Sequence, residues 1–446
     1  MQSPPLSDTR PVSNVSEQAL EAAVSKKVLR RIVPFIFFFA MVGYLDRSNV
    51  SFAALTMNES LKFDATAFGI GAGIFSIGYC IFGIPANFAL RRFGARFWFS
   101  VILLVWGVVS ASTAFIHTKE QFYIARFLLG VAESGQGVGT LFFVTLWAPA
   151  KLRGRMMSVG GISSLVSAMI GAPLSAWILV HFAGASRFQS WQWLFLLEAL
   201  PSLLMALITV LFISSRPAEA RWLNPQERAW LVGTLETEYA ARRLSSHHSF
   251  KAALLDYRIS LLAITQFFQI LGFYGLLLWI PLIVKSHGLS TSQIGWSLGV
   301  VNAIAAVGVW LWGKHSDHTK ERKYHIVLPL LVTIVGAVLA AYAPTPLLVL
   351  VGLCLATWGA WASITTFWTI PPLLLSGAAA AGGIAFINSV ATLGGFFGPL
   401  IIGWIKTATG SFAGGLVSVA IAMVIAAILL MVVFRRPAEF GPRSGQ

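Results

Sequence analysis

The sequence predicts an all-α membrane protein with twelve transmembrane helices in two six-helix halves. Of its 446 residues, 57% are hydrophobic and only 11% are charged, whereas a soluble domain carries about twice that charged fraction. Apolar runs long enough to cross a bilayer recur along the chain. Basic residues gather in every second connection between these runs. This composition excludes a disordered, collagenous or disulfide-stapled chain.

The first half begins after a polar segment, 1–29, which we expect to be a cytoplasmic tail because it lacks the apolar core of a secretory signal. A span needs about 20 apolar residues. Six apolar runs meet this requirement between residues 30 and 214, at 30–57, 66–90, 96–116, 121–147, 155–181 and 190–214. This region is the predicted N-terminal bundle.

The segment 215–257 is polar and separates the halves. It contains Pro217 and Pro225, followed by a charged run with apolar residues at helical spacing, which indicates a cytoplasmic linker with a surface helix. The second bundle, 258–434, has expected spans at 258–284, 292–313, 325–343, 346–371, 379–405 and 412–434. A second cytoplasmic tail is expected over 435–446.

The net charge of +15 is divided among short clusters between the spans and does not form one basic patch. Positive loops stay in the cytoplasm, so the distribution of charge indicates that both termini lie on the cytoplasmic side of the membrane. We expect this membrane to be the inner, cytoplasmic membrane of the cell. We therefore expect contact with membrane lipid and no nucleic-acid partner. The cysteines, Cys80 and Cys354, are far apart in apolar runs, which leaves no disulfide framework or metal-ligand spacing. We expect no metal and no cofactor.

Two motifs recur at a similar offset in both halves and indicate an internal duplication. Gly171 and Pro173 correspond to Gly398 and Pro399. The other motif lies in the expected loop after the second span of each half: Gly83, Asn87, Arg91 and Arg92 correspond to Gly313, Asp317, Glu321 and Arg322. Ordinary positive loop sequence is the competing interpretation. Duplicated halves that face a central cavity are the architecture of the major facilitator superfamily, which predicts gating roles for these loops.

Charged side chains inside the spans are costly and are usually functional. Asp46, Arg47, Arg126 and Glu133 lie in the first and fourth spans. Arg126 and Glu133 share a helix face about 10 Å apart, too far to pair without a third group. Two cations beside two titratable acids suit proton-coupled transport of an anion, because arginine binds carboxylates and a buried acid can exchange protons. Internal salt bridges are the alternative. For Glu198, in the sixth span, we favour a structural role.

Polar side chains elsewhere in the spans are weaker candidates. Tyr44 and Tyr79 lie at depths where a phenol can face the cavity, although core packing is equally compatible. In the second half Asn388 is the candidate we retain. Hydrogen bonding between helices is the alternative role for the whole group, which comprises Asn302, Asn388, Ser389, Ser363 to Thr366, Gln266 and Gln269.

Several runs resemble the anion:cation symporter family of the major facilitators, which includes bacterial tartrate, phthalate and sugar-acid permeases. They are Tyr44 to Ala53, Ile84 to Asn87, Arg92 to Arg96, Ala125 to Gly130 with Ala132 and Glu133, Trp191 to Phe195, and Ser316 with Asp317. The resemblance covers nearly the whole chain. It implies uptake of an organic acid anion with protons. It further implies that Asp46 and Glu133 are protonation sites and that Arg47, Tyr79 and Arg126 contact substrate.

The sequence departs from this family after Glu133. Bacterial members continue with a small residue, glycine, two aromatic residues, proline and glycine, whereas this chain has Ser134, Gly135, Gln136, Gly137, Val138 and Gly139. The departure predicts a more flexible and more polar fourth span beside the cavity. The departure therefore does not single out tartrate, and a larger or differently shaped acid is equally compatible.

We predict a monomeric, proton-coupled symporter that imports an organic acid anion, either a tartrate-like hydroxydicarboxylate or a sugar acid. An exporter or antiporter of another metabolite or a drug is the alternative, although two arginines inside the spans disfavour a carrier of cations. An enzyme is disfavoured because neither a nucleophile with a base nor a metal cluster is evident in the spans. A channel is the more distant option.

Overall fold

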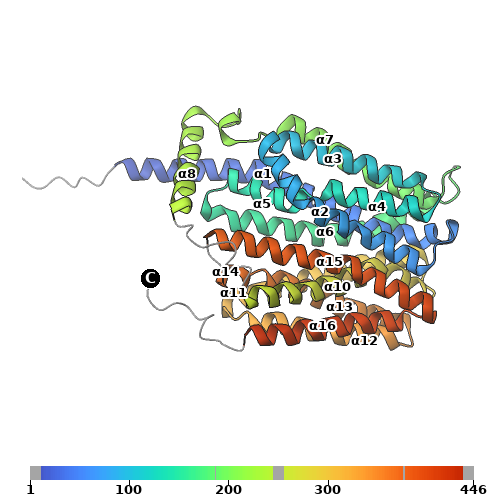
Figure 1. Cartoon of the computed structure of the whole chain (residues 1–446). Coiled ribbons are helices and arrows are strands. Elements are labelled where there is room, and N and C mark those ends of the chain that lie inside the picture. The colour runs from blue at the N-terminus through green and yellow to red at the C-terminus, as the bar shows by residue number, and fades with distance from the viewer. Residues whose placement is uncertain (1–11, 186, 245–255, 375–376, 435–446) are drawn as a thin grey trace, which may run out of the picture.

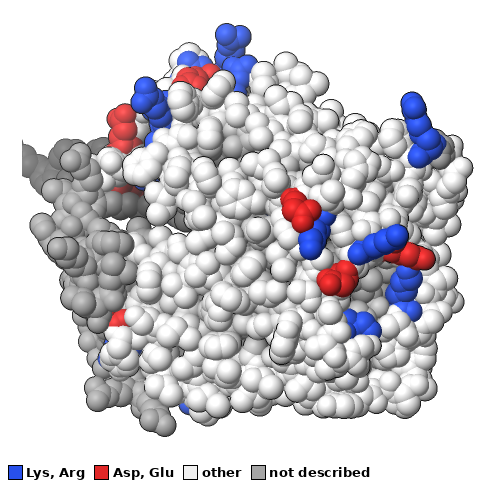
Figure 2. Space-filling model, turned by 45° about the vertical axis from the view of Figure 1, so that its right-hand side comes forward, with Lys and Arg blue, Asp and Glu red and all other residues white. Residues whose placement is uncertain are grey.

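Helices make up nearly all of the computed structural model, which describes residues 12–185, 187–244, 256–374 and 377–434. Within these described ranges, twelve helical segments are long and apolar enough to cross a membrane. The chain is therefore a multi-pass membrane protein. Charged side chains are sparse on the face in Figure 2, where they lie mainly toward the two ends of the molecule.

Six spans form the N-terminal half. They are α1 (Val12–Ser60), α2 (Ala65–Phe93), α3 (Ala95–Ser112) with the short η1 (Thr113–Phe115), α4 (Lys119–Glu133) with α5 (Gln136–Trp147), α6 (Ala150–His181) and α7 (Ser190–Phe212). Local chemistry sets several boundaries. Asp64 caps α2 by accepting a hydrogen bond from the backbone N–H of Ala67 at 2.6 Å. Gly94 has φ of +80° and separates α2 from α3.

The C-terminal half contains the other six spans: α10 (Tyr257–Lys285), α11 (Thr291–Thr319), α12 (Lys323–Tyr342), α13 (Pro346–Phe367) with the single turn α14 (Pro371–Leu374), α15 (Gly377–Thr409) and α16 (Ala413–Val433). Ser290 and Gln293 form a reciprocal capping box at the start of α11. The number of spans is even, so the described chain begins and ends on the same side.

Between the halves lie η2 (Pro217–Glu219) and α8 (Pro225–Leu244), at the place where a surface helix is expected. Helix α8 crosses the outer part of α1 at the end of the molecule where the described chain begins (Figure 1). Lys27 on α1 pairs with Glu227 at 2.7 Å, and Arg153 on α6 pairs with Glu238 at 2.7 Å. These contacts attach α8 to the N-terminal half.

Two sequence expectations about helix bounds differ from the structure. Much of the segment expected as a tail, 1–29, is helical because α1 begins at Val12 and its extension packs beside α8. Gly83, Asn87, Arg91 and Arg92 lie in the last turns of α2 and not in a loop, and Gly313 and Asp317 lie inside α11. Both helices continue past the apolar run, since polar side chains at the helix ends can reach water. The tail 435–446 falls outside the described residues.

The halves contact each other mainly through α2 with α15 and through α6 with α11. At the end opposite the described termini, Thr66 and Thr407 are hydrogen-bonded at 2.9 Å, and a Cβ on Gly295 would lie 2.2 Å from the Cβ of Ala176. Along α2 the contacts with α15 extend to Cys80, whose thiol lies 3.6 Å from the carbonyl oxygen of Ser389. Beyond this point Gly83 has open space around it. The halves therefore meet at one end and separate toward the other.

Candidate functional site

The charged side chains predicted inside the first and fourth spans come together in the N-terminal half. The Nε atom of Arg47 on α1 donates a hydrogen bond to Oε2 of Glu133 on α4 at 2.6 Å. Glu133 is completely buried, and its other carboxylate oxygen has no hydrogen-bond partner among the described residues. Among Asp46, Arg47, Arg126 and Glu133, this is the one salt bridge in the described part of the chain.

Asp46 and Arg47 have separate partners, as their neighbouring positions on one helix require. Asp46 is buried and accepts hydrogen bonds from Trp106 Nε1 and Ser110 Oγ of α3, and from Asn49 Nδ2 at 3.1 Å. The side chains that donate hydrogen bonds to Asp46 are therefore uncharged. A carboxylate in such a setting can hold or release a proton without breaking an ion pair.

Arg126 on α4 is buried, with 2% of its surface exposed, and its Nε and Nη1 atoms have no hydrogen-bond partner among the described residues. Its guanidinium carbon lies 5.2 Å from the centre of the Phe75 ring, and that of Arg47 lies 5.5 Å from the same ring. Both arginines therefore lie close to the Phe75 ring. A buried guanidinium with unused donors is an energetically costly arrangement that an anion would relieve.

Gln136 was not among the predicted site residues, although the departure from the family pattern begins at this position. The fourth span is interrupted at Ser134 and Gly135, and Gln136 starts α5. Its Oε1 accepts a hydrogen bond from Arg47 Nη2 at 3.0 Å, and its Nε2 donates to the carbonyl oxygen of Phe39 at 2.7 Å. The additional polar residue expected in the fourth span is therefore in direct contact with Arg47.

A polar cavity of about 150 Å³ lies between the halves and includes Arg47. Tyr79 and Asn388, both predicted site residues, line it together with Gln266. The rest of its lining consists of Phe75, Ser76, Ile270, Tyr274, Trp368, Ala391 and Thr392. Gln266 is fully buried, and both polar atoms of its amide lack a partner among the described residues. Within the described part of the chain, the Gln266 side chain therefore makes no hydrogen bond to another helix, and its amide is available to a ligand.

The structure divides the remaining predicted residues. The ring of Tyr79 lies 5.1 Å from the guanidinium carbon of Arg47. Tyr44 lines a second, separate cavity with Asn302 and Trp361, and its hydroxyl has no partner among the described residues. Glu198 lines neither cavity and accepts a hydrogen bond from Ser175 at 2.6 Å. In the motif of the second half, Arg322 pairs with Asp317 at 2.9 Å.

Comparison with known proteins identifies the family. The model of the Major Facilitator Superfamily matches residues 36–399. The chain belongs to this superfamily. Its members are transporters and not enzymes, so the chain is a membrane transporter.

Individual relatives of this superfamily member cover almost its whole length. It is 43% identical to the "Putative tartrate transporter" of Agrobacterium vitis, over 93% of this chain and 92% of the relative. It is also 36% identical to the "Quinolone resistance transporter" of Acinetobacter baumannii, over 93% and 96% of the two chains. Among solved structures, a bacterial homologue of the human lysosomal transporter Spinster has a TM-score of 0.77 at 15% identity, covering 93% and 98%.

Proposed function

We propose that the chain imports an organic acid anion together with protons across the bacterial cytoplasmic membrane. The substrate is a hydroxydicarboxylate like tartrate or a sugar acid. The observation that carries this proposal is the position of Arg47, which pairs with the buried Glu133 and also lines the polar cavity between the halves. The relationship to a protein named for tartrate supports the substrate class.

The coupling follows from competition for one cation. A substrate carboxylate that binds Arg47 displaces Glu133, and a carboxylate that loses its cation while buried is stabilised by taking up a proton. Substrate and proton occupancy are then linked energetically. In this proposal Asp46 is the second proton carrier, Arg126 completes the carboxylate clamp, and Tyr79 recognises a substrate hydroxyl with Tyr44 and Asn388. The proton is the coupling ion, and no other cofactor is involved.

Transport then proceeds by rocking of the halves about the site. The basic connections predict that the termini and α8 lie in the cytoplasm, so the end at which the halves separate faces inward. The last turns of α2 and α11, which carry Gly83, Asn87, Arg91, Arg92, Gly313 and Asp317, together with Arg322 just after α11, act as the gating elements of that end. The transporter functions as a monomer in contact with membrane lipid.

Uptake into liposomes tests the proposal. Purified protein is reconstituted and offered tartrate, sugar acids and aromatic carboxylates, with and without an outside-acid pH gradient. We expect at least one acid to accumulate only when the gradient is present. Equal accumulation without the gradient would contradict proton coupling, and no uptake of any acid by folded protein would contradict the substrate class.

The second candidate function is export of a drug or another metabolite, which the 36% identity to a quinolone resistance transporter favours. The same liposomes distinguish it. A drug exporter would exchange a quinolone for protons and would ignore the acids, whereas the proposed symporter moves an acid and protons in the same direction.

A further inference from the structure

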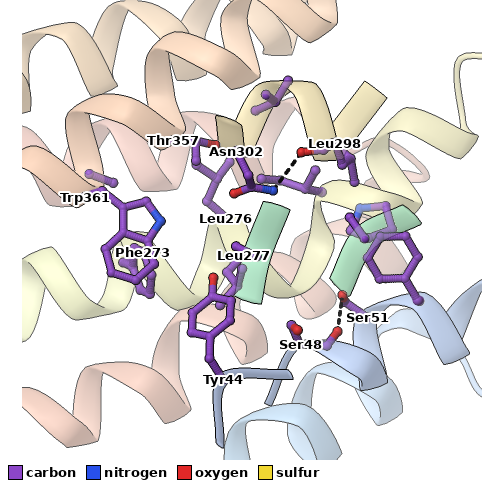
Figure 3. A pocket seen from close by; sticks show the side chains of 17 residues that line it. Tyr44, Ser48, Ser51, Phe273, Leu276, Leu277, Leu298, Asn302, Thr357 and Trp361 are labelled. Atoms are coloured by element: carbon purple, nitrogen blue, oxygen red, sulfur yellow. Dashed lines mark hydrogen bonds between the residues drawn. The ribbon is translucent and has the colours of Figure 1, made fainter. Parts of the chain in front are cut away.

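A second cavity lies between the halves, beside the polar cavity and closer to the end at which they meet. Its volume of about 40 Å³ takes about three waters at 10–15 Å³ each. The N-terminal half contributes Tyr44, Ser48, Ser51 and Phe52 of α1, with Ala168 and Ala172 of α6. The C-terminal half contributes residues of α10, α11 and α13, among them Phe273, Asn302 and Trp361 (Figure 3).

None of the residues lining this cavity carries a charge. The rings of Tyr44 and Phe273 lie 5.7 Å and 4.9 Å from the ring of Trp361, so three aromatic side chains form one wall. A carboxylate placed here would lose its hydration without meeting a cation, which is strongly unfavourable. The cavity therefore suits the uncharged part of a molecule.

Two hydroxyl groups in the lining have no hydrogen-bond partner among the described residues. They belong to Tyr44, which is 8% exposed, and to Thr357, which is 7% exposed. Figure 3 shows the Tyr44 hydroxyl directed away from α1 toward Phe273 and Leu277, with Thr357 near Asn302 across the cavity. The amide of Asn302 already donates to the carbonyl oxygen of Leu298 at 2.8 Å. Buried hydroxyls without partners are uncommon in native proteins, and a ligand would satisfy them.

The cavity lies within reach of the arginine site. Tyr44 and Arg47 are three residues apart on α1, which makes them neighbours on one helix face, with Cβ atoms about 5–6 Å apart. Ser48 in the lining follows Arg47 directly. A small acid held by its carboxylate at Arg47 can therefore direct its other end into this space.

We propose that the second cavity binds the uncharged end of the transported acid, an apolar chain or ring that carries a hydroxyl group. The inference rests on the proposed uptake of an organic acid anion and changes the substrate expected within that class. The second cavity favours a hydroxylated monocarboxylate over a dicarboxylate such as tartrate. Thr357 becomes a specificity-determining residue of the site.

Binding of matched acids tests this inference. Affinities of the full-length protein are measured by titration calorimetry for 4-hydroxybenzoate, which has the hydroxyl, for benzoate, which lacks it, and for tartrate. Three proteins are compared: wild type, Thr357→Val and Thr365→Val. Thr365 is the control because it lies on the same helix but is exposed, and its hydroxyl donates to the carbonyl oxygen of Trp361 at 2.9 Å.

We expect the wild type to bind 4-hydroxybenzoate more tightly than benzoate or tartrate. One neutral hydrogen bond accounts for about a threefold to tenfold change in affinity, so Thr357→Val should weaken 4-hydroxybenzoate binding by that factor and leave benzoate unchanged. Thr365→Val should change neither. The Thr357→Val protein should fold because the substitution removes a hydroxyl that had no partner.

Two outcomes would overturn the inference, and they are distinguishable. If acids bind and Arg47→Gln abolishes binding, but Thr357→Val and Tyr44→Phe leave every affinity unchanged, the cavity is not a subsite and the proposed function stands. If the folded wild-type protein neither binds the three acids of the calorimetry nor takes up any acid of the liposome panel, the proposed function fails and the subsite fails with it.

Discussion

At the scale of single residues, the site depends on how the guanidinium of Arg47 is held. Glu133 accepts from its Nε atom and Gln136 from its Nη2 atom, so one edge of the guanidinium is fixed by one acid and one amide. Glu133 can be neutralised by a proton, but Gln136 cannot. Gln136 therefore keeps Arg47 in place when Glu133 is protonated and the substrate binds.

Gln136→Leu should raise the KM for the transported acid about tenfold or more, because a hydrogen bond to a charged group contributes about 1.5–3 kcal/mol. The maximal rate should change less than KM, since the proton carriers remain. Uptake kinetics in liposomes measure both constants. Thr145→Val is the matched control: Thr145 lies on the same helix, and its hydroxyl donates only within α5, to the carbonyl oxygen of Phe142. An unchanged KM in Gln136→Leu would remove Gln136 from the site.

Arg126 is the second residue on which the anion site depends. Its buried Nε and Nη1 donors have no partner among the described residues, so a bound carboxylate is expected to use them. Arg126→Ala should abolish detectable substrate binding in calorimetry while the protein remains monodisperse in detergent. Arg126→Lys should not restore binding, because an ammonium group cannot reproduce the two-pronged contact. Retained affinity in Arg126→Ala would exclude it from the clamp.

The sequence predicted which residue types form the site better than it predicted their contacts. The cost of charge inside a span identified Asp46, Arg47, Arg126 and Glu133 without any structure. Two contacts were not predictable. The sequence does not distinguish Gln136 from other polar residues. Its contact with Arg47 depends on the interruption of the helix after Glu133, which only the structure shows. Tyr44 and Tyr79 have similar depths, and only the packing of the two halves assigns them to different cavities.

At the scale of elements, the apolar runs correctly predicted the twelve spans, but several helices extend beyond their apolar run into polar residues. The pattern of apolar residues does not predict where a helix ends once it extends out of the membrane. The extension of α1 to Val12 is stabilised by contacts with α8, which is distant in sequence, and so could not be predicted from residues 12–29 alone.

The attachment of α8 should depend on pH. The hydrogen bond from Lys27, with a second from the backbone N–H of Asn224, holds the pKa of Glu227 below its usual value. An acid whose pKa is lowered by folding stabilises the folded state above its unfolded pKa, and this contribution disappears as the pH falls through the lowered value.

Glu227→Gln should therefore increase hydrogen exchange in α8 at pH 7, whereas at a pH below the lowered pKa of Glu227 variant and wild type should exchange alike. Hydrogen-exchange mass spectrometry at each pH makes the comparison. Glu236→Gln is the control, because Glu236 is an exposed acid on the same helix. A difference that persists unchanged in acid would show that the Glu227 charge is not responsible.

At the scale of the whole molecule, the meeting of the halves at one end depends on small residues. An added Cβ at Gly295 would also lie 3.0 Å from the backbone oxygen of Ala172, so the neighbouring helix must move to admit a side chain. Alternating access requires that this contact opens during the cycle. Its stability therefore sets the balance between the two orientations of the transporter.

Gly295→Leu should shift that balance toward the state open at this end. Cys80 and Cys354 are replaced by Ser, and spin labels are attached to cysteines introduced at Glu59 and Ser411. Pulsed electron paramagnetic resonance then measures the distance between the two labels, and so between the halves. We expect a longer distance in Gly295→Leu. Gly160→Leu is the control, because Gly160 has open space around it, and it should leave the distance unchanged. A distance in Gly295→Leu equal to that of the parent would contradict the assignment of this contact as the gate.

The central claim is that substrate and Glu133 compete for Arg47, so that binding of the acid drives uptake of a proton. The most direct measurement follows the pH of a weakly buffered solution of purified transporter, with an indicator dye, when a transported acid is added at neutral pH. The account predicts that protons disappear from solution in proportion to the bound acid, and that Glu133→Gln binds the acid with less proton uptake. Binding of the acid by wild-type protein without any proton uptake would contradict it.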